Sequence, residues 1–289
     1  MTDADNKRGI LLMALTMFIF AMQDGISRHL AGEYNVIMIV MIRYWFFAAF
    51  VLAISMRDKD GLQKVASTKQ PILQLTRGLL LALEICVMVL AFTLLGLIES
   101  LAIFAAYPLI VAALSGPILG EYVGPRRWAA IGIGFVGILI ILQPGLAVFS
   151  PYAFVAICSA ALFALYSLLT RYAARLDSTA TSFFWTGIVG AISMTMVGIW
   201  FWEPMVYRDW LWMAALCVSG AGGHYCLIKV YMIAEASAVQ PFAYLQLVFA
   251  SFIGIFVFHE IVSLNIILGA IIVVGAGVFT LLRAQKATA

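Results

Sequence analysis

Charge is scarce in this sequence. Of its 289 residues only 11% are Asp, Glu, Lys or Arg, whereas 64% are hydrophobic. Soluble globular domains carry about 25% charged residues, because a surface that faces water needs them. A soluble fold is therefore excluded, and most of the outer surface must face lipid. Because a spanning helix uses roughly 20 apolar residues, ten such helices leave only short connections and no separate soluble domain.

Groups that do chemistry are also few. The four cysteines lie in apolar runs without a C-x-x-C pair, and we interpret them as free, buried thiols. Gly132-Ile-Gly-Phe-Val-Gly137 matches the dinucleotide-binding fingerprint, but it lies inside an apolar run without a preceding strand. Small residues at this spacing are typical of close helix packing in membranes. We expect no enzyme activity, cofactor or metal, and the net charge of +3 forms no basic patch for a nucleic acid.

Long apolar runs are what the chain has in abundance. They predict an all-α integral membrane protein with ten transmembrane helices, at residues 9–30, 35–55, 72–95, 99–119, 126–143, 152–172, 180–202, 209–231, 238–258 and 263–283. Turn signals such as Gln143-Pro144-Gly145 and Glu203-Pro204 separate these runs. The first run is too long for a signal peptide and has no clear cleavage site, so it is interpreted as a membrane helix.

Lysine and arginine predict the orientation. With a cytoplasmic N-terminus, 14 of the 17 basic residues fall on the inner side, and only Arg28, Arg43 and Arg208 fall on the outer half. Cytoplasmic loops of membrane proteins carry an excess of Lys and Arg. We therefore expect both termini in the cytoplasm and a multi-pass protein of the cell's inner (plasma) membrane. A helix more or fewer would scatter this asymmetry.

The two halves of the chain echo each other. Trp45 is echoed by Trp185, and Leu119-Gly120-Glu121 is echoed by Phe258-His259-Glu260. Each unit holds five predicted helices, and because five is odd the second unit must lie upside down in the membrane. We therefore predict two inverted repeats, at residues 1–148 and 149–289. Secondary transporters often use this plan, with the binding site between the halves near the midplane.

These repeat ends resemble a known family. The run from Pro241 to Phe249 with His259-Glu260, and the run from Pro108 to Leu119-Gly120-Glu121, resemble the two signatures of the drug/metabolite transporter superfamily, in particular its ten-helix EamA-type carriers. The resemblance covers nearly the whole chain, with one departure at His259, where the family more often has Gly. It implies export or exchange of small solutes, with amino acids, especially aromatic and neutral ones, a frequent substrate class.

Ionisable groups at membrane depth are costly, so each is a candidate for function. Glu84 lies near the middle of the third predicted helix, either as a cavity carboxylate that binds an amine or a proton, or as a protonated group bonded between helices. Asp24 and Arg28 are four residues apart in the favourable order for an ion pair, and Arg43 should lie at a similar depth. These three form either an outer gate or a structural cluster between the first two helices, and we favour the structural cluster.

The remaining candidates for substrate contact are less strongly charged. His224 follows three glycines and could contact substrate, relay a proton or bind a neighbouring carbonyl. Tyr107 and Tyr244 are approximate repeat equivalents beside Pro108 and Pro241, where a helix can hinge. The other candidates are two neutral amides, Gln240 and Gln246, and two aromatic residues, Phe104 and Trp185, for which ordinary packing is the alternative.

The sequence thus predicts a secondary carrier that works by alternating access through a central cavity lined by its third, fourth, eighth and ninth helices. An aromatic or neutral amino acid is the expected cargo, on the strength of the resemblance and the aromatic candidates, with protons as a possible coupling ion and lipid around the helices. Export of organic cations by proton antiport is the alternative, in which Glu84 and Asp24 would bind the cation. A scaffold without a cavity, or a lipid-modifying membrane enzyme, would be a different class.

Overall fold

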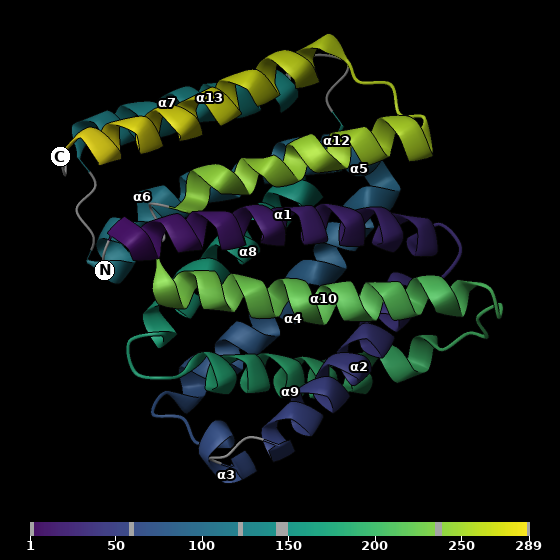
Figure 1. Cartoon of the computed structure of the whole chain (residues 1–289). Coiled ribbons are helices and arrows are strands. Elements are labelled where there is room, and N and C mark those ends of the chain that lie inside the picture. The colour runs from purple at the N-terminus through teal and green to yellow at the C-terminus, as the bar shows by residue number, and fades with distance from the viewer. Residues whose placement is uncertain (1–2, 58–60, 121–123, 143–149, 235–238, 288–289) are drawn as a thin grey trace.

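The computed structural model describes residues 3–57, 61–120, 124–142, 150–234 and 239–287, and in this part of the chain all regular structure is helical. Figure 1 shows a bundle of long helices joined by short connections. The first half contains α1 (Asp3–Ala31), α2 (Val36–Arg57), α3 (Gly61–Ala66), α4 (Pro71–Leu95), α5 (Leu97–Phe104), α6 (Tyr107–Leu119) and α7 (Pro125–Leu142). The second half contains α8 (Ala153–Ala173), α9 (Thr179–Gly198), η1 (Ile199–Phe201), α10 (Asp209–Ile233), η2 (Gln240–Tyr244), α12 (Leu245–Phe258) and α13 (Leu264–Ala287).

Seven segments of the described chain are long and apolar enough to span a membrane. They are residues 8–31, 36–56, 71–95, 97–119, 153–173, 179–201 and 209–233. Three shorter apolar helices accompany them, Ile131–Ile141, Phe242–Phe258 and Leu264–Ala276. Each of these ten segments overlaps one of the predicted runs, so the all-helical membrane character of the chain is confirmed.

Two of the predicted helices are interrupted. The fourth run is divided at Ala105 and Ala106 into α5 and α6, and the ninth run begins with the 3-10 turn η2. A proline lies close to each interruption: Pro108 follows Ala106, and Pro241 lies within η2. Each proline lacks the backbone N–H that would continue the helical hydrogen bonds. The interruptions place irregular backbone where the two halves of the bundle meet.

Helices of the first half of the chain pack against helices of the second half. The most extensive contacts join α1 to α10, α4 to α8, α2 to α9 and α7 to α13. Figure 1 shows the α7–α13 pair side by side at one edge of the bundle and α3 at the opposite edge. It also shows that α1 begins and α13 ends on the same side of the bundle (left).

Glycine allows α7 and α13 to approach closely. A Cβ atom built on Gly137 would lie 2.9 Å from the carbonyl oxygen of Gly269, and one built on Gly269 would lie 2.6 Å from that of Gly137. Gly134 leaves room for the Leu109 side chain, whose Cδ1 would be 2.5 Å from an added Cβ. The interpretation of the Gly132–Gly137 pattern as a helix-packing surface is therefore confirmed for Gly134 and Gly137.

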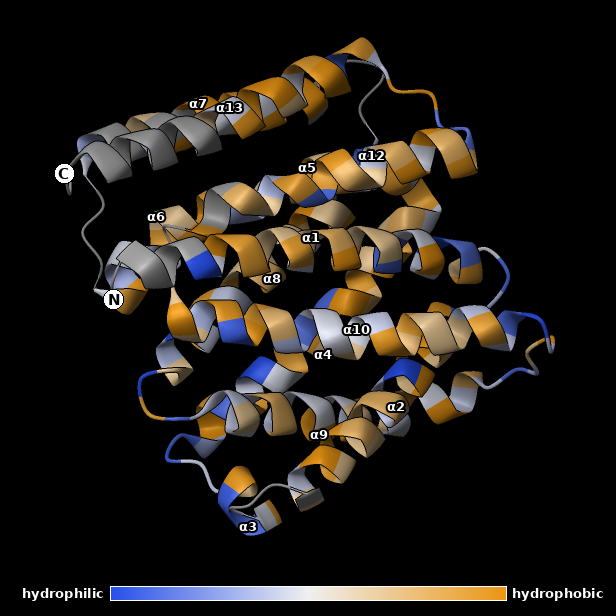
Figure 2. Cartoon of the chain, viewed as in Figure 1, coloured by the Kyte–Doolittle hydropathy of each residue, from blue (hydrophilic) through white to orange (hydrophobic). Residues whose placement is uncertain are grey.

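Polarity is inverted relative to a water-soluble protein. Large apolar side chains such as Phe256 and Leu211 are exposed on the outer surface, and Figure 2 shows apolar residues along much of the long helices. The interior instead holds buried charged and polar residues, among them Asp24, Arg43 and Glu84. Such groups gather inside membrane proteins where they face one another or a cavity. One cysteine departs from expectation, because the free thiol of Cys158 is exposed.

Candidate functional site: a central polar cavity

Several of the buried polar residues meet in one cavity in the middle of the bundle. It contains about 430 Å³ of space between atoms, of which about 40 Å³ can hold the centre of a water molecule. A site for one water needs roughly 10–15 Å³ on that second measure. The cavity therefore has room for a few waters. Its walls are formed by Phe20, Gln23, Asp24, Ser27, Arg43, Glu84, Ile85, Met88, Val89, Phe92, Phe104, Phe163, His224 and Gln246.

The cavity draws on more helices than the sequence predicted. The third, fourth, eighth and ninth helices do contribute, through α4, α5, α10 and α12. Helix α1 adds a row of four residues at one-turn spacing, Phe20, Gln23, Asp24 and Ser27, and α2 and α8 add one each. Residues three and four apart lie on one helix face, so α1 presents a polar stripe to the cavity.

The two cavity acids are both hydrogen-bonded. Glu84 accepts a hydrogen bond from the Ser159 hydroxyl across the α4–α8 contact, at 2.7 Å. Asp24 accepts one from the Gln246 amide at 2.6 Å, which joins α1 to α12. Each carboxylate can accept further hydrogen bonds, because an ionised carboxylate has about four lone-pair sites. These acids can therefore still bind a cationic or N–H group in the cavity.

Arg43 is the basic group of the cavity. Its Nη2 atom donates to the Gln23 Oε1 atom at 2.9 Å and lies 3.3 Å from Nε2 of His224. Because a guanidinium can only donate, Nε2 of His224 must accept, which puts the proton of a neutral ring on Nδ1. Nδ1 is buried and has no hydrogen-bond partner among the described residues. Arg43 and His224 together thus offer donors to an anionic or carbonyl group.

Aromatic rings line the rest of the cavity. Phe104 and Phe163 face each other with ring centroids 5.4 Å apart, and Phe20 lies 5.1 Å from the His224 ring. Rings at these separations form favourable tilted or edge-to-face contacts. Aromatic ring faces beside charged groups suit a cargo that contains both a ring and charged groups.

A smaller pocket adjoins the cavity where α5 and α6 meet η2 and α12. It contains about 210 Å³ of space between atoms, and Phe104 and Gln246 line both spaces. Tyr107 and Tyr244 line it together, and their buried hydroxyls have no hydrogen-bond partner among the described residues. The two tyrosines, approximate equivalents in the two halves of the sequence, thus line one pocket.

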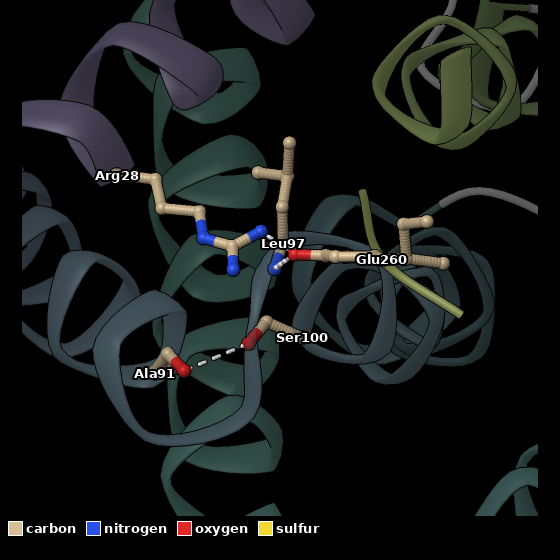
Figure 3. Close-up of polar contacts among 6 residues, drawn as sticks. Arg28, Ala91, Leu97, Ser100 and Glu260 are labelled. Atoms are coloured by element: carbon tan, nitrogen blue, oxygen red, sulfur yellow. Dashed lines mark hydrogen bonds and ion pairs between the residues drawn. The ribbon is translucent and has the colours of Figure 1, made fainter. Parts of the chain in front are cut away.

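One end of the bundle holds a pairing that the sequence did not predict. Arg28 forms an ion pair with Glu260 and stacks its guanidinium 4.3 Å from the centroid of the Phe258 ring. Glu260 also accepts hydrogen bonds from the backbone N–H groups of Leu97 and Ile98, at 2.7 and 2.8 Å, as Figure 3 shows for Leu97. A carboxylate at a helix N-terminus satisfies otherwise unpaired donors. The three links fasten α1 and α5 to the α12–α13 connection.

The expected ion pair between Asp24 and Arg28 is therefore wrong. Spacing of four residues made it available, but the two side chains turn to different partners, Gln246 for Asp24 and Glu260 for Arg28. The expected link between the first two helices does form, through Arg43 and Gln23 rather than through an ion pair.

In the connection between α1 and α2, Tyr34 donates a hydrogen bond to Asp209 at 2.7 Å, which raises the pKa of the Tyr34 hydroxyl.

A second polar network lies near the start of α4. Gln74 donates to Asp177 at 2.8 Å and to Ser182 at 3.2 Å, while Arg77 donates to Thr170 at 3.0 Å and bonds with Gln74. All of these residues except Asp177 lie within helices, and the network joins α4 to α8 and α9.

One predicted contact, Trp185, lines neither pocket. Trp185 donates its indole N–H to the carbonyl oxygen of Ala66 at 3.0 Å, so it fastens α9 to the last residue of α3. The side chain of Gln240 lies outside the described residues, as does Glu121. The cavity wall contains six of the predicted residues, namely Asp24, Arg43, Glu84, Phe104, His224 and Gln246.

Several residues of the site escaped sequence reasoning. Ser159, Gln23 and Glu260 are ordinary polar residues, and only their distant partners reveal their roles. Arg77 was counted as an inner basic residue, although it lies six positions inside α4 and is 0% exposed. Counting how far each basic residue lies from the end of its apolar run would have separated Arg77 from the loop lysines.

Comparison with known proteins agrees with this architecture. The sequence profile of the EamA-like transporter family matches the chain twice, at residues 7–143 and 150–282. The chain belongs to the EamA-like transporter family. The expected family is therefore confirmed, and the protein is a multi-pass membrane transporter rather than an enzyme. The two matches together span nearly the whole sequence, with the boundary between them close to residue 148.

Individual relatives are distant but cover nearly the full length. The chain is 25% identical to the S-adenosylmethionine uptake transporter of Rickettsia prowazekii, over 96% of this chain and 94% of the relative. It is 28% identical to the riboflavin transporter of Brucella anthropi, over 89% and 93%. A solved crystal structure superposes with a TM-score of 0.70 at 17% identity, covering 100% of both chains, which shows a shared fold. These relatives are named for metabolites other than amino acids.

Proposed function

We propose that this transporter of the EamA-like family is a secondary carrier that exchanges a small metabolite bearing an amino-acid end and a second positive charge, with S-adenosylmethionine the leading cargo. The observation that carries the proposal is the charge arrangement of the cavity, where Asp24 and Glu84 face Arg43. S-adenosylmethionine combines a carboxylate, an ammonium, a sulfonium and an adenine ring. Its charges complement those of the two acids and one arginine.

Each part of this cargo finds a suitable partner. Arg43 can bind the carboxylate, since a guanidinium matches carboxylate geometry, and Nδ1 of His224 offers a further donor. Asp24 and Glu84 can bind the ammonium and sulfonium. The rings of Phe104 and Phe163 offer faces for adenine or for the sulfonium cation. The S-adenosylmethionine transporter among the relatives supports this assignment.

An aromatic amino acid, the cargo first expected, shares the amino-acid end but brings only one cation for two acids. An organic cation lacks the carboxylate that Arg43 would bind. Both remain transport candidates that the same cavity could serve with one polar partner unused. Burying an unpaired charge is costly, so the cavity favours a cargo that pairs all three groups.

Alternating access through two inverted five-helix repeats, residues 1–148 and 149–289, is the proposed mechanism. The double family match and the packing of α1 with α10 and of α8 with α4 support it, because an inverted repeat relates these two pairs. The closing contacts at the outer and inner ends would open in turn, with protons as a candidate coupling ion. Ten spanning helices and cytoplasmic termini belong to the same proposal. A green fluorescent protein fused after Ala289 would fluoresce in cells if the C-terminus is cytoplasmic and stay dark if it is external.

Counterflow in liposomes tests the cargo. Liposomes that contain the purified protein are loaded with unlabelled S-adenosylmethionine, riboflavin, phenylalanine or tetraphenylphosphonium. Entry of the same compound in labelled form is then followed. We expect accumulation of labelled S-adenosylmethionine, reduced about tenfold or more by Arg43→Gln as one charge-assisted hydrogen-bonding group is lost. Accumulation of tetraphenylphosphonium alone, unaffected by Arg43→Gln, would instead establish the organic-cation carrier. Entry of none of the four into liposomes with folded protein would reject the proposed cargo.

A further inference from the structure

Arg77 is a buried arginine that the central cavity does not use. It is 0% exposed, and its Nη2 atom has no hydrogen-bond partner among the described residues. It forms no ion pair with a described carboxylate, because Asp177 is reached only through Gln74. An unpaired charge buried at membrane depth is costly and is retained where it serves function. The guanidinium therefore has spare donor capacity for an anionic group.

Arg77 lies on the same helix as the cavity acid Glu84, closer to the start of α4. Arg77 lies seven residues before Glu84 on α4, which is two helical turns and about 10 Å along the axis. Residues seven apart share a helix face, so Arg77 lies on the face that carries the cavity acid. The side chain of Leu81, 0% exposed, lies between them on that face.

Arg77 and Arg43 have closely similar surroundings. Each guanidinium bonds with a glutamine amide, Gln74 for Arg77 and Gln23 for Arg43. Each also lies against a ring of the neighbouring helix, since Arg77 is 5.3 Å from the Tyr166 centroid and Arg43 is 3.3 Å from the His224 ring nitrogen. Neither guanidinium is paired with an acid within ion-pair distance in the described part of the chain.

The helices around the two arginines are also related. Arg43 lies among α1, α2 and α10, whereas Arg77 and its bonded Gln74 contact α8 and α9 from α4. An inverted five-helix repeat exchanges α1 with α8, α2 with α9 and α10 with α4. The two guanidinium groups thus lie among corresponding sets of three helices, although Arg43 belongs to α2 and Arg77 to α4, which are not exchanged with each other.

We propose that Arg77 is a second binding site for the carboxylate of the cargo, exposed when the inner half opens. The inference rests on the proposed carrier function and adds a sided anion site to it. Gln74 and Thr170 occupy part of the guanidinium in the closed form. When α4 separates from α8, the cargo carboxylate moves from Arg43 to Arg77 on its way to the inner face.

Thiol labelling tests whether position 77 lines the inner route, without any assumption about cargo. Arg77→Cys is made in a background with the four native cysteines replaced by serine, and a membrane-impermeant methanethiosulfonate is added to vesicles of either orientation. We expect labelling from the inner face and not from the outer face. Leu79→Cys is the matched control, because its side chain is 44% exposed on the lipid-facing surface and should stay unlabelled. Absence of labelling from the inner face would overturn the proposal.

Sided transport kinetics test whether Arg77 binds a carboxylate. For Arg77→Gln we expect the half-saturating concentration of S-adenosylmethionine to rise about tenfold on the inner side, as expected when a charge-assisted hydrogen bond is lost, with the outer value unchanged. Arg77→Lys should restore part of the loss, and the decarboxylated analogue should be unaffected. Lys69→Gln, which removes an exposed cation from the same end and keeps the backbone N–H bond of residue 69 to Asp177, should match the wild type.

The outcomes separate the site from the function. Equal loss on both sides, or equal loss for the decarboxylated analogue, would show a structural role for Arg77 and overturn the proposal. If wild-type protein moves no S-adenosylmethionine although position 77 is labelled from the inner face, the cargo assignment fails while an inner-facing site is upheld.

Discussion

The polar side chains inside the bundle are of two kinds. Some have their hydrogen-bonding atoms paired, and others leave a donor or acceptor without a partner. Glu260 uses both carboxylate oxygens to bind α5 and pairs with Arg28, which gives it a fastening role at the outer end. Nδ1 of His224 and the hydroxyls of Tyr107 and Tyr244 have no partner among the described residues. Buried donors without partners cost free energy, so they mark where cargo or water would bind.

Glu260→Gln should weaken the outer closure. The amide cannot form the ion pair with Arg28, and one of its two terminal atoms no longer accepts from the α5 backbone. Because charge-assisted hydrogen bonds contribute about 1.5–3 kcal/mol each, we expect a loss of stability of about 1–3 kcal/mol. The unfolding midpoint of purified protein, followed by circular dichroism, measures it. Glu203→Gln, at an exposed acceptor for the backbone N–H of Asn35, should change the midpoint little; equal effects would contradict the fastening role.

His259 should be replaceable by glycine with a gain in stability. Its φ of 54° lies in the left-handed region, which a side chain with a Cβ adopts at a cost. Gly120 closes α6 with φ 72° at the corresponding end of the first half. His259→Gly should raise stability by about 0.5–1 kcal/mol, and Gly120→Ala should lower it by a similar amount. A lower unfolding midpoint for His259→Gly would show that the imidazole itself stabilises the connection.

At the scale of helices, apolar run length was a sufficient signal for the long segments. Runs of about 20 apolar residues between turn signals have one physical interpretation in a chain with this little charge. The short helix α3 and the break between α5 and α6 could not be predicted, because both depend on packing against other segments rather than on local composition. Pro108 and Pro241 indicated where interruptions would occur but not their form.

Close contact between α2 and α9 should depend on a single glycine. A Cβ atom on Gly190 would lie 1.9 Å from Cε1 of the buried Tyr44 ring, so Gly190→Ala forces the ring or the helix to move. Overpacking of this kind costs about 1–3 kcal/mol. Gly222→Ala on α10 meets no atom within 4 Å and should be neutral or slightly stabilising, through helix propensity. Thermal unfolding of the two variants side by side measures the difference, and equal midpoints would contradict the predicted packing.

At the scale of the whole molecule, the site is formed by residues far apart in the chain. Asp24 meets Gln246 across 222 positions, and Glu84 meets Ser159 across 75. Sequence reasoning found the ionisable members, because charge at membrane depth is conspicuous, but it paired Asp24 with its nearest basic neighbour. Partners such as Gln23 and Ser159 carry no signal of their own. Helix packing alone determines which of them face the cavity.

Cargo should cross the membrane through this cavity, and Glu84→Gln is the variant that tests it. Liposomes that contain wild-type protein and unlabelled S-adenosylmethionine should accumulate the labelled compound. Accumulation by the variant should be lower by about tenfold or more, because a buried cation of the cargo loses its charged partner. The variant must unfold at a midpoint close to that of the wild type for the comparison to hold. Wild-type accumulation that Glu84→Gln leaves unchanged would contradict transport through the cavity.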